Sequence, residues 1–167
     1  MTKTAKKEAN FTYQALALMS RLFYEKFGEE ALPIIRDVWY RMGLASGELF
    51  KKKMTDFDFK SAAGYINERN KQIGEMETCL ISEDLYHIAT PCGFCCDVGL
   101  ENAGHAICEA VMSINKGQFK SICGFDVEMN IVQSKAAGFD RCEIMYYPIG
   151  LSNEKKESAQ TRRREEK

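Results

Sequence analysis

The sequence predicts an α+β fold in which long N-terminal helices precede a small antiparallel sheet with an inserted helix and a C-terminal β-hairpin. In the first half of the chain, apolar residues recur every three or four positions, the pattern of amphipathic helices. Later stretches are short and alternate between apolar and polar residues, as half-buried strands do. The chain has 167 residues, of which 45% are hydrophobic and 28% charged. These values fit one ordinary globular domain.

The helical part divides into three segments, which the apolar spacing places at 11–27, 29–49 and 57–66. Gly28 interrupts the first pattern, and Pro33 is tolerated because it stands near the start of the second helix. Thr55 or Asp56 is expected to cap the third helix.

Strands are expected in chain order at 79–82, 85–90, 127–132 and 141–147. Pro91 stops the second strand, and Pro148 closes the last one. Helical spacing returns over 101–115, which inserts a helix between the second and third strands. A turn at 135–140 joins the last two strands into a β-hairpin.

One folded domain is expected over 11–150. The charged ends, 1–10 and 151–167, are expected to be disordered tails, because a segment that buries little cannot offset its ordering entropy. The net charge of −1 lacks the basic footprint of a dedicated nucleic-acid binder. The sequence has no run of about 18 apolar residues and no apolar leader at its start. We therefore expect a cytoplasmic protein without a nucleic-acid or membrane partner.

The unusual feature is the cysteine content: seven residues, five of them between 92 and 123. In a cytoplasmic chain these are expected to be reduced thiols available for metal binding, catalysis or redox chemistry. Cys92 and Cys95 form a C-x-x-C pair, with Cys96 directly after it. Such a pair suits zinc, although no second pair follows. It also suits a redox or persulfide carrier that uses Cys92, Cys95 and Cys96.

The predicted inserted helix offers a catalytic arrangement. Glu101, His105, Cys108 and Met112 follow the spacing i, i+4, i+7 and i+11, which places them along the side opposite its core face. A carboxylate that orients an imidazole, which in turn draws the proton from a thiol, is an activated nucleophile. The alternative is a solvated face on which Cys108 is a small filler.

Two further residues have a functional and a structural interpretation. Asp126 follows Cys123 at a helix-to-strand junction, where a carboxylate can act as a base or bind an ammonium group, or can bond its own turn. His87 lies on a strand and is expected to be a partly buried histidine with a satisfied hydrogen bond.

The order of the motifs in the second half resembles a known family. The matching stretches are Pro91-Cys92, Cys108, Cys123-Gly124-Phe125-Asp126, Ser134 and Gly138-Phe139-Asp140-Arg141-Cys142-Glu143-Ile144. They resemble the family named for L-2-amino-thiazoline-4-carboxylic acid hydrolase, which is related to the 4-vinyl reductase type of small-molecule-binding domain. The resemblance covers about residues 11–148.

The resemblance implies a hydrolase that opens a C–N bond in a small cyclic amidine or thiazoline-like substrate. Cys108 or Cys123 would be the nucleophile, and His105 or Asp126 would be the acid/base group. Glu101, Met112 and Ser134 are the expected substrate-binding residues. The related domains imply a zinc ion held partly by Cys108 and Cys142. The full candidate set for a metal, zinc or iron, is Cys92, Cys108, Cys123 and Cys142.

Two other functions compete with hydrolysis. One is a non-catalytic module that binds or senses a small molecule, a metal or a tetrapyrrole between the helices and the sheet. The other is the cysteine-based redox or persulfide carrier. In each case a small molecule is the expected partner, and the aromatic N-terminal helices favour a homodimer.

Overall fold

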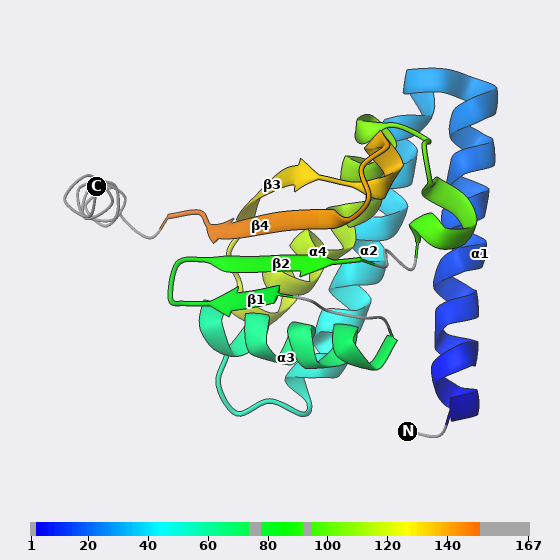
Figure 1. The fold of residues 1–167 in the computed structure, drawn as a ribbon. Helices are drawn as coiled ribbons and strands as arrows, with labels where there is room; N and C mark the ends of the chain where they lie inside the picture. The colour runs from blue at the N-terminus through cyan, green and yellow to red at the C-terminus, as the bar shows by residue number, and fades with distance from the viewer. Residues whose placement is uncertain (1–2, 74–77, 92–94, 151–167) are drawn as a thin grey trace.

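A computed structural model describes residues 3–73, 78–91 and 95–150 (Figure 1). Its elements are, in chain order, α1 (Lys3–Phe27), η1 (Gly28–Ala31), α2 (Leu32–Lys51), α3 (Phe59–Ile73), β1 (Thr78–Ile81), β2 (Tyr86–Thr90), η2 (Cys96–Leu100), α4 (His105–Cys123), β3 (Val127–Gln133), η3 (Lys135–Ala137) and β4 (Cys142–Pro148). The elements η1 and η3 are short 3₁₀-helices, and η2 is a π-helix. The predicted α+β fold is confirmed.

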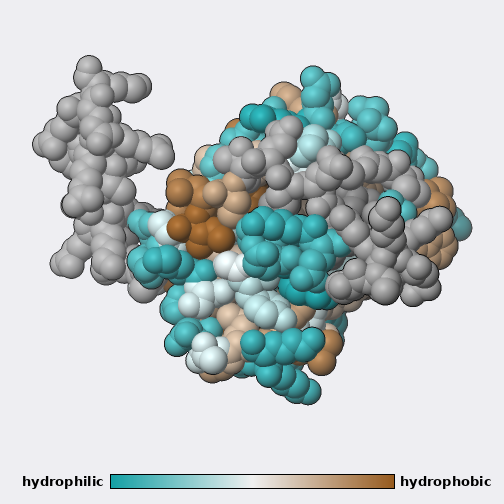
Figure 2. All heavy atoms as spheres, turned by 60° about the horizontal axis from the view of Figure 1, so that its bottom comes forward, coloured by the Kyte–Doolittle hydropathy of each residue, from teal (hydrophilic) through white to brown (hydrophobic). Residues whose placement is uncertain are grey.

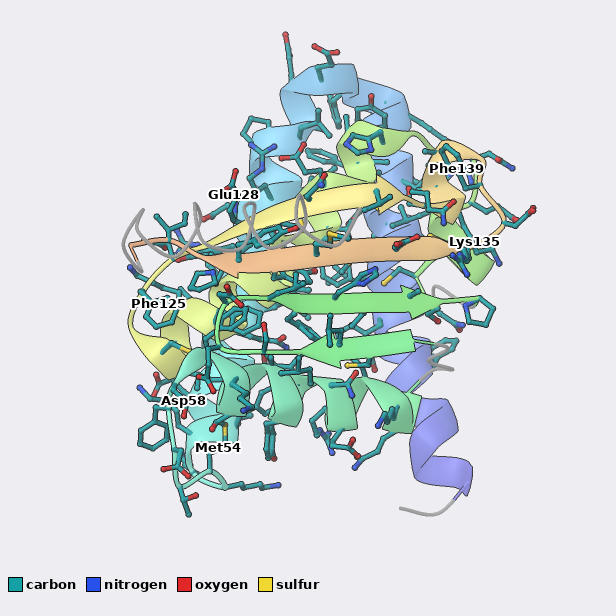
Figure 3. The ribbon with its side chains drawn as sticks, turned by 60° about the vertical axis from the view of Figure 1, so that its left-hand side comes forward. Met54, Asp58, Phe125, Glu128, Lys135 and Phe139 are labelled. Atoms are coloured by element: carbon teal, nitrogen blue, oxygen red, sulfur yellow. The ribbon has the colours of Figure 1, made fainter. Side chains whose placement is uncertain are left out.

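The strands form one antiparallel sheet in the order β1-β2-β4-β3. The last two strands pair as the predicted hairpin, with η3 between them, and a bulge shifts their register between Ile131 and Gln133. Cys142 pairs with Thr90 at one end of β4, and Pro148 pairs with Val127 at the other end. Helices α3 and α4 pack on one face of this sheet (Figures 1 and 3).

Glycines bring α2 and α4 into backbone contact. A side-chain carbon added at Gly43 would overlap the Ile114 carbonyl, and one added at Gly117 would overlap the Tyr40 carbonyl. Because no larger residue fits at either point, the two helices pack closely against each other. Helix α4 is consequently covered on two sides, by α2 and by the sheet.

Several boundaries differ from the expected ones. Helix α1 begins at Lys3, within the segment expected to be a tail. Helix α3 begins at Phe59, where Asp58 caps it by accepting a 2.8 Å bond from the Ser61 amide, so the predicted caps Thr55 and Asp56 are wrong. Helix α4 runs from His105 to Cys123 and not over 101–115, since its buried side chains continue past the expected end. The predicted tail 151–167 lies outside the described residues.

The core divides into two regions. The cysteine-rich region lies among α1, α2, η2, α4, η3 and β4, and its buried members are Ala17, Ala31, Ile35, Trp39, Cys95, Cys96, Leu100, Ile107, Cys108, Ala110, Val111, Ile114, Ala136 and Cys142. The aromatic region lies between α3, α4 and the sheet, and its buried members are Phe59, Ala62, Ala63, Ile66, Tyr86, Ile88, Phe119, Ile122, Val127, Ile144 and Tyr146.

The outer surface beside α3 is largely hydrophilic (Figure 2). Lys60, Glu68 and Lys71 are exposed on this helix, which buries its opposite side in the aromatic region. Within the described residues, none of the helices combines the length and apolar character needed to cross a membrane.

Candidate functional site

Four thiols gather at one end of the molecule. Cys95 and Cys96 stand at the start of η2, Cys108 lies in the first turn of α4, and Cys142 is the first residue of β4. All four are buried in the cysteine-rich region. Segments far apart in the sequence thus bring four of the seven cysteines into one part of the core.

Hydrogen bonds connect these thiols with the turn around η3. The Cys96 and Cys142 side chains are hydrogen-bonded to each other, and Cys108 is hydrogen-bonded to Ser134. The Lys135 amide donates to Cys142 Sγ at 3.5 Å. Ser134 is fully buried, and its hydroxyl oxygen also accepts a 3.2 Å bond from the Ala137 amide, which caps η3.

The local environment keeps Cys95, Cys96 and Cys108 protonated. Burial raises the pKa of Cys108 to about 11, although the bond to Ser134 acts in the opposite direction. The bond to Cys142, together with burial, raises the pKa of Cys96, and burial raises that of Cys95. A reactive cysteine needs a lowered pKa, because the thiolate is the nucleophile. The arrangement therefore supplies neutral, polarisable sulfur and not an activated nucleophile.

The π-helix η2 fixes Cys95 and Cys96 against α1. Its wide turns are closed by bonds from the Leu100 amide to the Cys95 carbonyl and from the Glu101 amide to the Cys96 carbonyl, both 3.1 Å. Arg21 of α1 donates to the carbonyls of Gly99, at 3.2 Å, and Glu101, at 3.1 Å. Gly99 lies so close to the α1 backbone that an added side chain would meet it. Helix α1 thus forms one wall of the cysteine-rich region.

The predicted row along the inserted helix does not form as expected. Glu101 precedes α4 and is exposed, so it shares no helix face with Cys108. His105 is the exposed first residue of α4, whereas Cys108 is buried and bonded to Ser134. Met112 is half-buried and packs against both core regions. The error has a simple cause: the face expected to meet solvent is covered by η3 and β4.

Cys123 and Asp126 lie at the opposite end of the sheet from Cys108 and Cys142. Fifteen residues of helix separate Cys108 from Cys123, about 22 Å at 1.5 Å per residue. Figure 3 shows the two ends, with Asp58 and Phe125 at one and Lys135 and Phe139 at the other. One active site cannot contain both of the predicted nucleophiles.

The surroundings of Cys123 and Asp126 are structural in character. Cys123 Sγ donates to the Asp58 carbonyl at 3.7 Å, and burial raises the pKa of this thiol to about 12. The Asp126 carboxylate forms an exposed ion pair with Lys120 at 2.9 Å. Neither group is aimed at the cysteine-rich region.

The candidate metal ligands are only partly brought together. Cys108 and Cys142 share the cysteine-rich region, Cys123 does not, and Cys92 lies outside the described residues. Within the described ranges, no three His, Cys, Asp or Glu side chains are placed to hold a metal ion. Zinc and iron binding, and the ligand set proposed for it, therefore stay a prediction; Cys123 lies in the other core region from Cys108 and Cys142.

A polar cluster on the outer face of the sheet was only partly anticipated. His87 Nε2 lies 2.9 Å from Glu143 Oε1, and Gln133 donates to the other carboxylate oxygen at 2.9 Å. Arg141 lies 3.6 Å from the same carboxylate. The bond to His87, followed by that from Gln133, lowers the pKa of Glu143. His87 is thus partly buried and hydrogen-bonded, as predicted; strand alternation alone does not identify its partner, which depends on the register.

Comparison with known proteins supports the fold. No protein-family model matches the sequence, and no curated protein matches it. The phenol-responsive sensory domain of the transcription activator PoxR, solved with phenol, is similar with a TM-score of 0.57 and 16% identity over 89% of this chain and 80% of that chain.

A second similar structure is trafficking protein particle complex subunit 3 from Naegleria fowleri, solved covalently bound to palmitic acid. Its TM-score is 0.58, with 14% identity over 88% of this chain and 96% of that chain. At these identities the similarity shows the fold alone, a small α+β architecture. It does not extend to the hydrolase family named from the sequence motifs.

Proposed function

We propose that this protein is a non-catalytic module that binds a small, largely apolar molecule in the cysteine-rich region. The observation that carries the proposal is the gathering of four buried thiols from η2, α4 and β4 beside the Ser134 hydroxyl. Cysteine is small, weakly polar and polarisable, so such a surface suits an apolar group better than a charged one. The hydroxyl and the thiols add weak hydrogen-bonding groups that could orient one polar atom of the ligand.

The side chains of this region are suited to repacking around a bound molecule. Most of its members are alanine, cysteine or a medium-sized aliphatic residue, and Trp39 is its one fully buried large aromatic side chain among the described residues. The two similar structures support the same proposal, since one was solved with phenol and the other with palmitic acid.

Ring-opening hydrolysis has no comparable support. Its nucleophile would need a lowered pKa, whereas burial raises the pKa of both Cys108 and Cys123. Its acid/base residues, His105 and Asp126, are exposed and belong to opposite ends of α4. A redox carrier meets the same difficulty at Cys95 and Cys96, whose pKa values are also raised.

The test uses the full chain and two probes, phenol and palmitic acid. Trp39, the single tryptophan, lies in the cysteine-rich region and donates a 3.0 Å bond to Ser20, so its fluorescence reports on that region. We expect one or both probes to change Trp39 emission and to raise the unfolding temperature with a saturable concentration dependence. No shift of either signal with either probe would overturn the proposal.

A matched pair of variants locates the binding. Cys108→Met adds volume to the cysteine-rich region, whereas Cys123→Met makes the same change at the other end of α4. We expect the first variant to weaken probe binding at least tenfold and the second to leave it unchanged. Circular dichroism checks that both are folded, because overpacking a core can cost about 1–3 kcal/mol. Equal effects of the two substitutions would place the ligand elsewhere.

We also propose that the module acts as a homodimer, as the aromatic N-terminal helices suggest. The support is the exposure of large apolar side chains on α1, among them Phe11, Met19 and Leu22.

A further inference from the structure

Helix α1 has two apolar faces. Its inner face carries Ala17 and Ser20, both buried, and packs on the cysteine-rich region. Its outer face carries a second apolar row, which we call the α1 stripe: Phe11 (71% exposed), Ala15, Leu18 (39%), Met19 (65%) and Leu22 (55%). An amphipathic helix at the edge of a domain normally presents polar side chains outward. The α1 stripe therefore marks a contact surface.

The spacing within the stripe is that of a helix-pairing seam. Phe11, Ala15, Leu18 and Leu22 are separated by four, three and four residues, the alternation with which side chains of paired helices interlock. Helix α1 lies at one edge of the molecule, so another helix can approach along its length (Figure 1). The bonds from Arg21 to the Gly99 and Glu101 carbonyls hold the helix in place, which limits the ordering cost of such a contact.

Charge at the two ends of the helix selects the partner and its direction. Residues 3–8 contain three lysines and one glutamate, a net +2, and residues 25–30 contain three glutamates and one lysine, a net −2. Two copies placed antiparallel bring each basic end beside an acidic one, whereas a parallel pair would bring like charges together. The antiparallel arrangement also sets Phe11 opposite Leu22 and Ala15 opposite Leu18 across a two-fold axis.

We propose that a second copy of this chain docks on the α1 stripe, so that two α1 helices pack antiparallel about a two-fold axis. This inference rests on the homodimer part of the proposed function and names its contact. The exposed stripe amounts to a few hundred Å² per copy, below the roughly 800 Å² per partner of a standard interface. The dimer is accordingly a reversible one, with a Kd of about micromolar order.

The first experiment is sedimentation velocity of the full chain in reducing buffer over about 1–200 µM, a range that brackets such a Kd. We expect the mass to rise from that of one chain to that of two. Leu22→Glu should raise the Kd at least tenfold. Leu49→Glu, at an α2 position that is 59% exposed, is the matched control and should leave the Kd unchanged. A chain that remains a monomer at the top concentration, or equal effects of the two variants, would overturn the proposal.

Exchanging the charges at the two ends of α1 tests whether the paired helices run antiparallel. Glu29→Lys with Glu30→Lys should weaken the dimer, and adding Lys3→Glu with Lys7→Glu in the same chain should restore it. A parallel pair would show no such restoration, and this outcome would refute the antiparallel assignment. Binding of the stripe to vesicles of phosphatidylcholine and phosphatidylserine, with loss in Leu22→Glu and no dimer in solution, would assign the stripe to a lipid surface instead.

A negative result in the ligand-binding experiment and a negative result in the dimerisation experiment can be told apart. Probe binding to a monomeric Leu22→Glu variant is followed by Trp39 fluorescence, since Trp39 faces the inner side of α1 through Ser20. A dimer without probe binding would remove only the ligand proposal, and probe binding by a monomeric wild-type chain would remove only the dimer.

Discussion

The two halves of the core are built from different side chains. In the aromatic region, Phe119 contacts the rings of Phe59, Tyr86 and Tyr146, with centroid distances of 5.0–6.2 Å. In the cysteine-rich region, most buried side chains are small, and the polar groups beside them include the thiols, the Ser20 and Ser134 hydroxyls and the Trp39 indole N–H. Large interlocking rings hold the sheet on α3 and α4, whereas small side chains fill the space beside α1.

Because of this difference, the aromatic region contributes more to stability, whereas the cysteine-rich region tolerates changes in packing more easily. Aromatic packing contributes through a large buried area and defined ring geometry, both of which a foreign molecule would disturb. Cysteine and alanine contribute less per residue, and a change among them alters fewer contacts. The aromatic region is accordingly the scaffold, and the cysteine-rich region is where we propose that a ligand binds.

The largest expected effect is the loss of a central ring. Phe119→Ala removes a fully buried side chain shared by three aromatic neighbours and should lower the free energy of unfolding by about 4 kcal/mol. Cys108→Ala, on the same helix, should cost only about 1 kcal/mol. Urea unfolding followed by circular dichroism measures both. Similar losses in the two variants would contradict the division of the core.

The second-largest expected effect is a loss of stability at alkaline pH. The pKa of Cys108 rises from its ordinary value of 9.0 to about 11 in the folded protein, so between these values the folded state holds a proton that the unfolded state has lost. Stability from this thiol is therefore intact below pH 9 and falls as the pH rises to about 11, by on the order of 2 kcal/mol. Urea unfolding at several pH values should show a steeper decline for wild type than for Cys108→Ala. Parallel curves would argue against a buried, protonated Cys108.

Smaller effects are expected from one buried hydrogen bond in each region. Tyr146→Phe leaves Asn115 Nδ2 without its 2.7 Å acceptor, and Ser20→Ala does the same to Trp39 Nε1. Each should cost about 1–2 kcal/mol, because a buried donor loses its partner. Only Ser20→Ala should shift the Trp39 emission spectrum. A shift in Tyr146→Phe as well would show that the two regions are coupled.

The smallest effect is expected at Asp126. Its ion pair with Lys120 is exposed, so Asp126→Asn should change the free energy of unfolding by less than about 0.5 kcal/mol. Probe binding should also be unaffected, because Asp126 is remote from the cysteine-rich region. A loss of binding in this variant, at unchanged stability, would move the functional site to the other end of the sheet.

Local patterns in the sequence predict most of the fold and little of the site. Helical spacing and strand alternation locate the helices and the paired strands, since both are properties of neighbouring residues. The error at Cys108 arises because periodicity shows one buried face, while α4 is covered on two sides. Gly43 and Gly47, four residues apart within a helix, are a signal of close helix packing, by which one side of α4 could have been assigned to a helix and the other to the sheet.

Such local patterns cannot predict the contacts among the cysteines. Cys96 and Cys142 are joined only by the register of β4 and the turns of η2, which depend on the whole fold. The same holds for His87 and Glu143, which lie on paired strands but are separated by 56 positions in the chain. The chemistry of the side chains identified the cysteines as the residues of interest. Only the tertiary structure shows that they divide between the cysteine-rich region and the aromatic region.

The two edge strands of the sheet, β1 and β3, are poor templates for pairing with strands of other molecules. Strand β1 has only four residues, and β3 is interrupted by the bulge between Ile131 and Gln133. An incoming strand needs a long and regular edge on which to form successive backbone hydrogen bonds. Neither edge of the sheet therefore offers a long, regular strand on which cross-β fibrils could grow from the folded state.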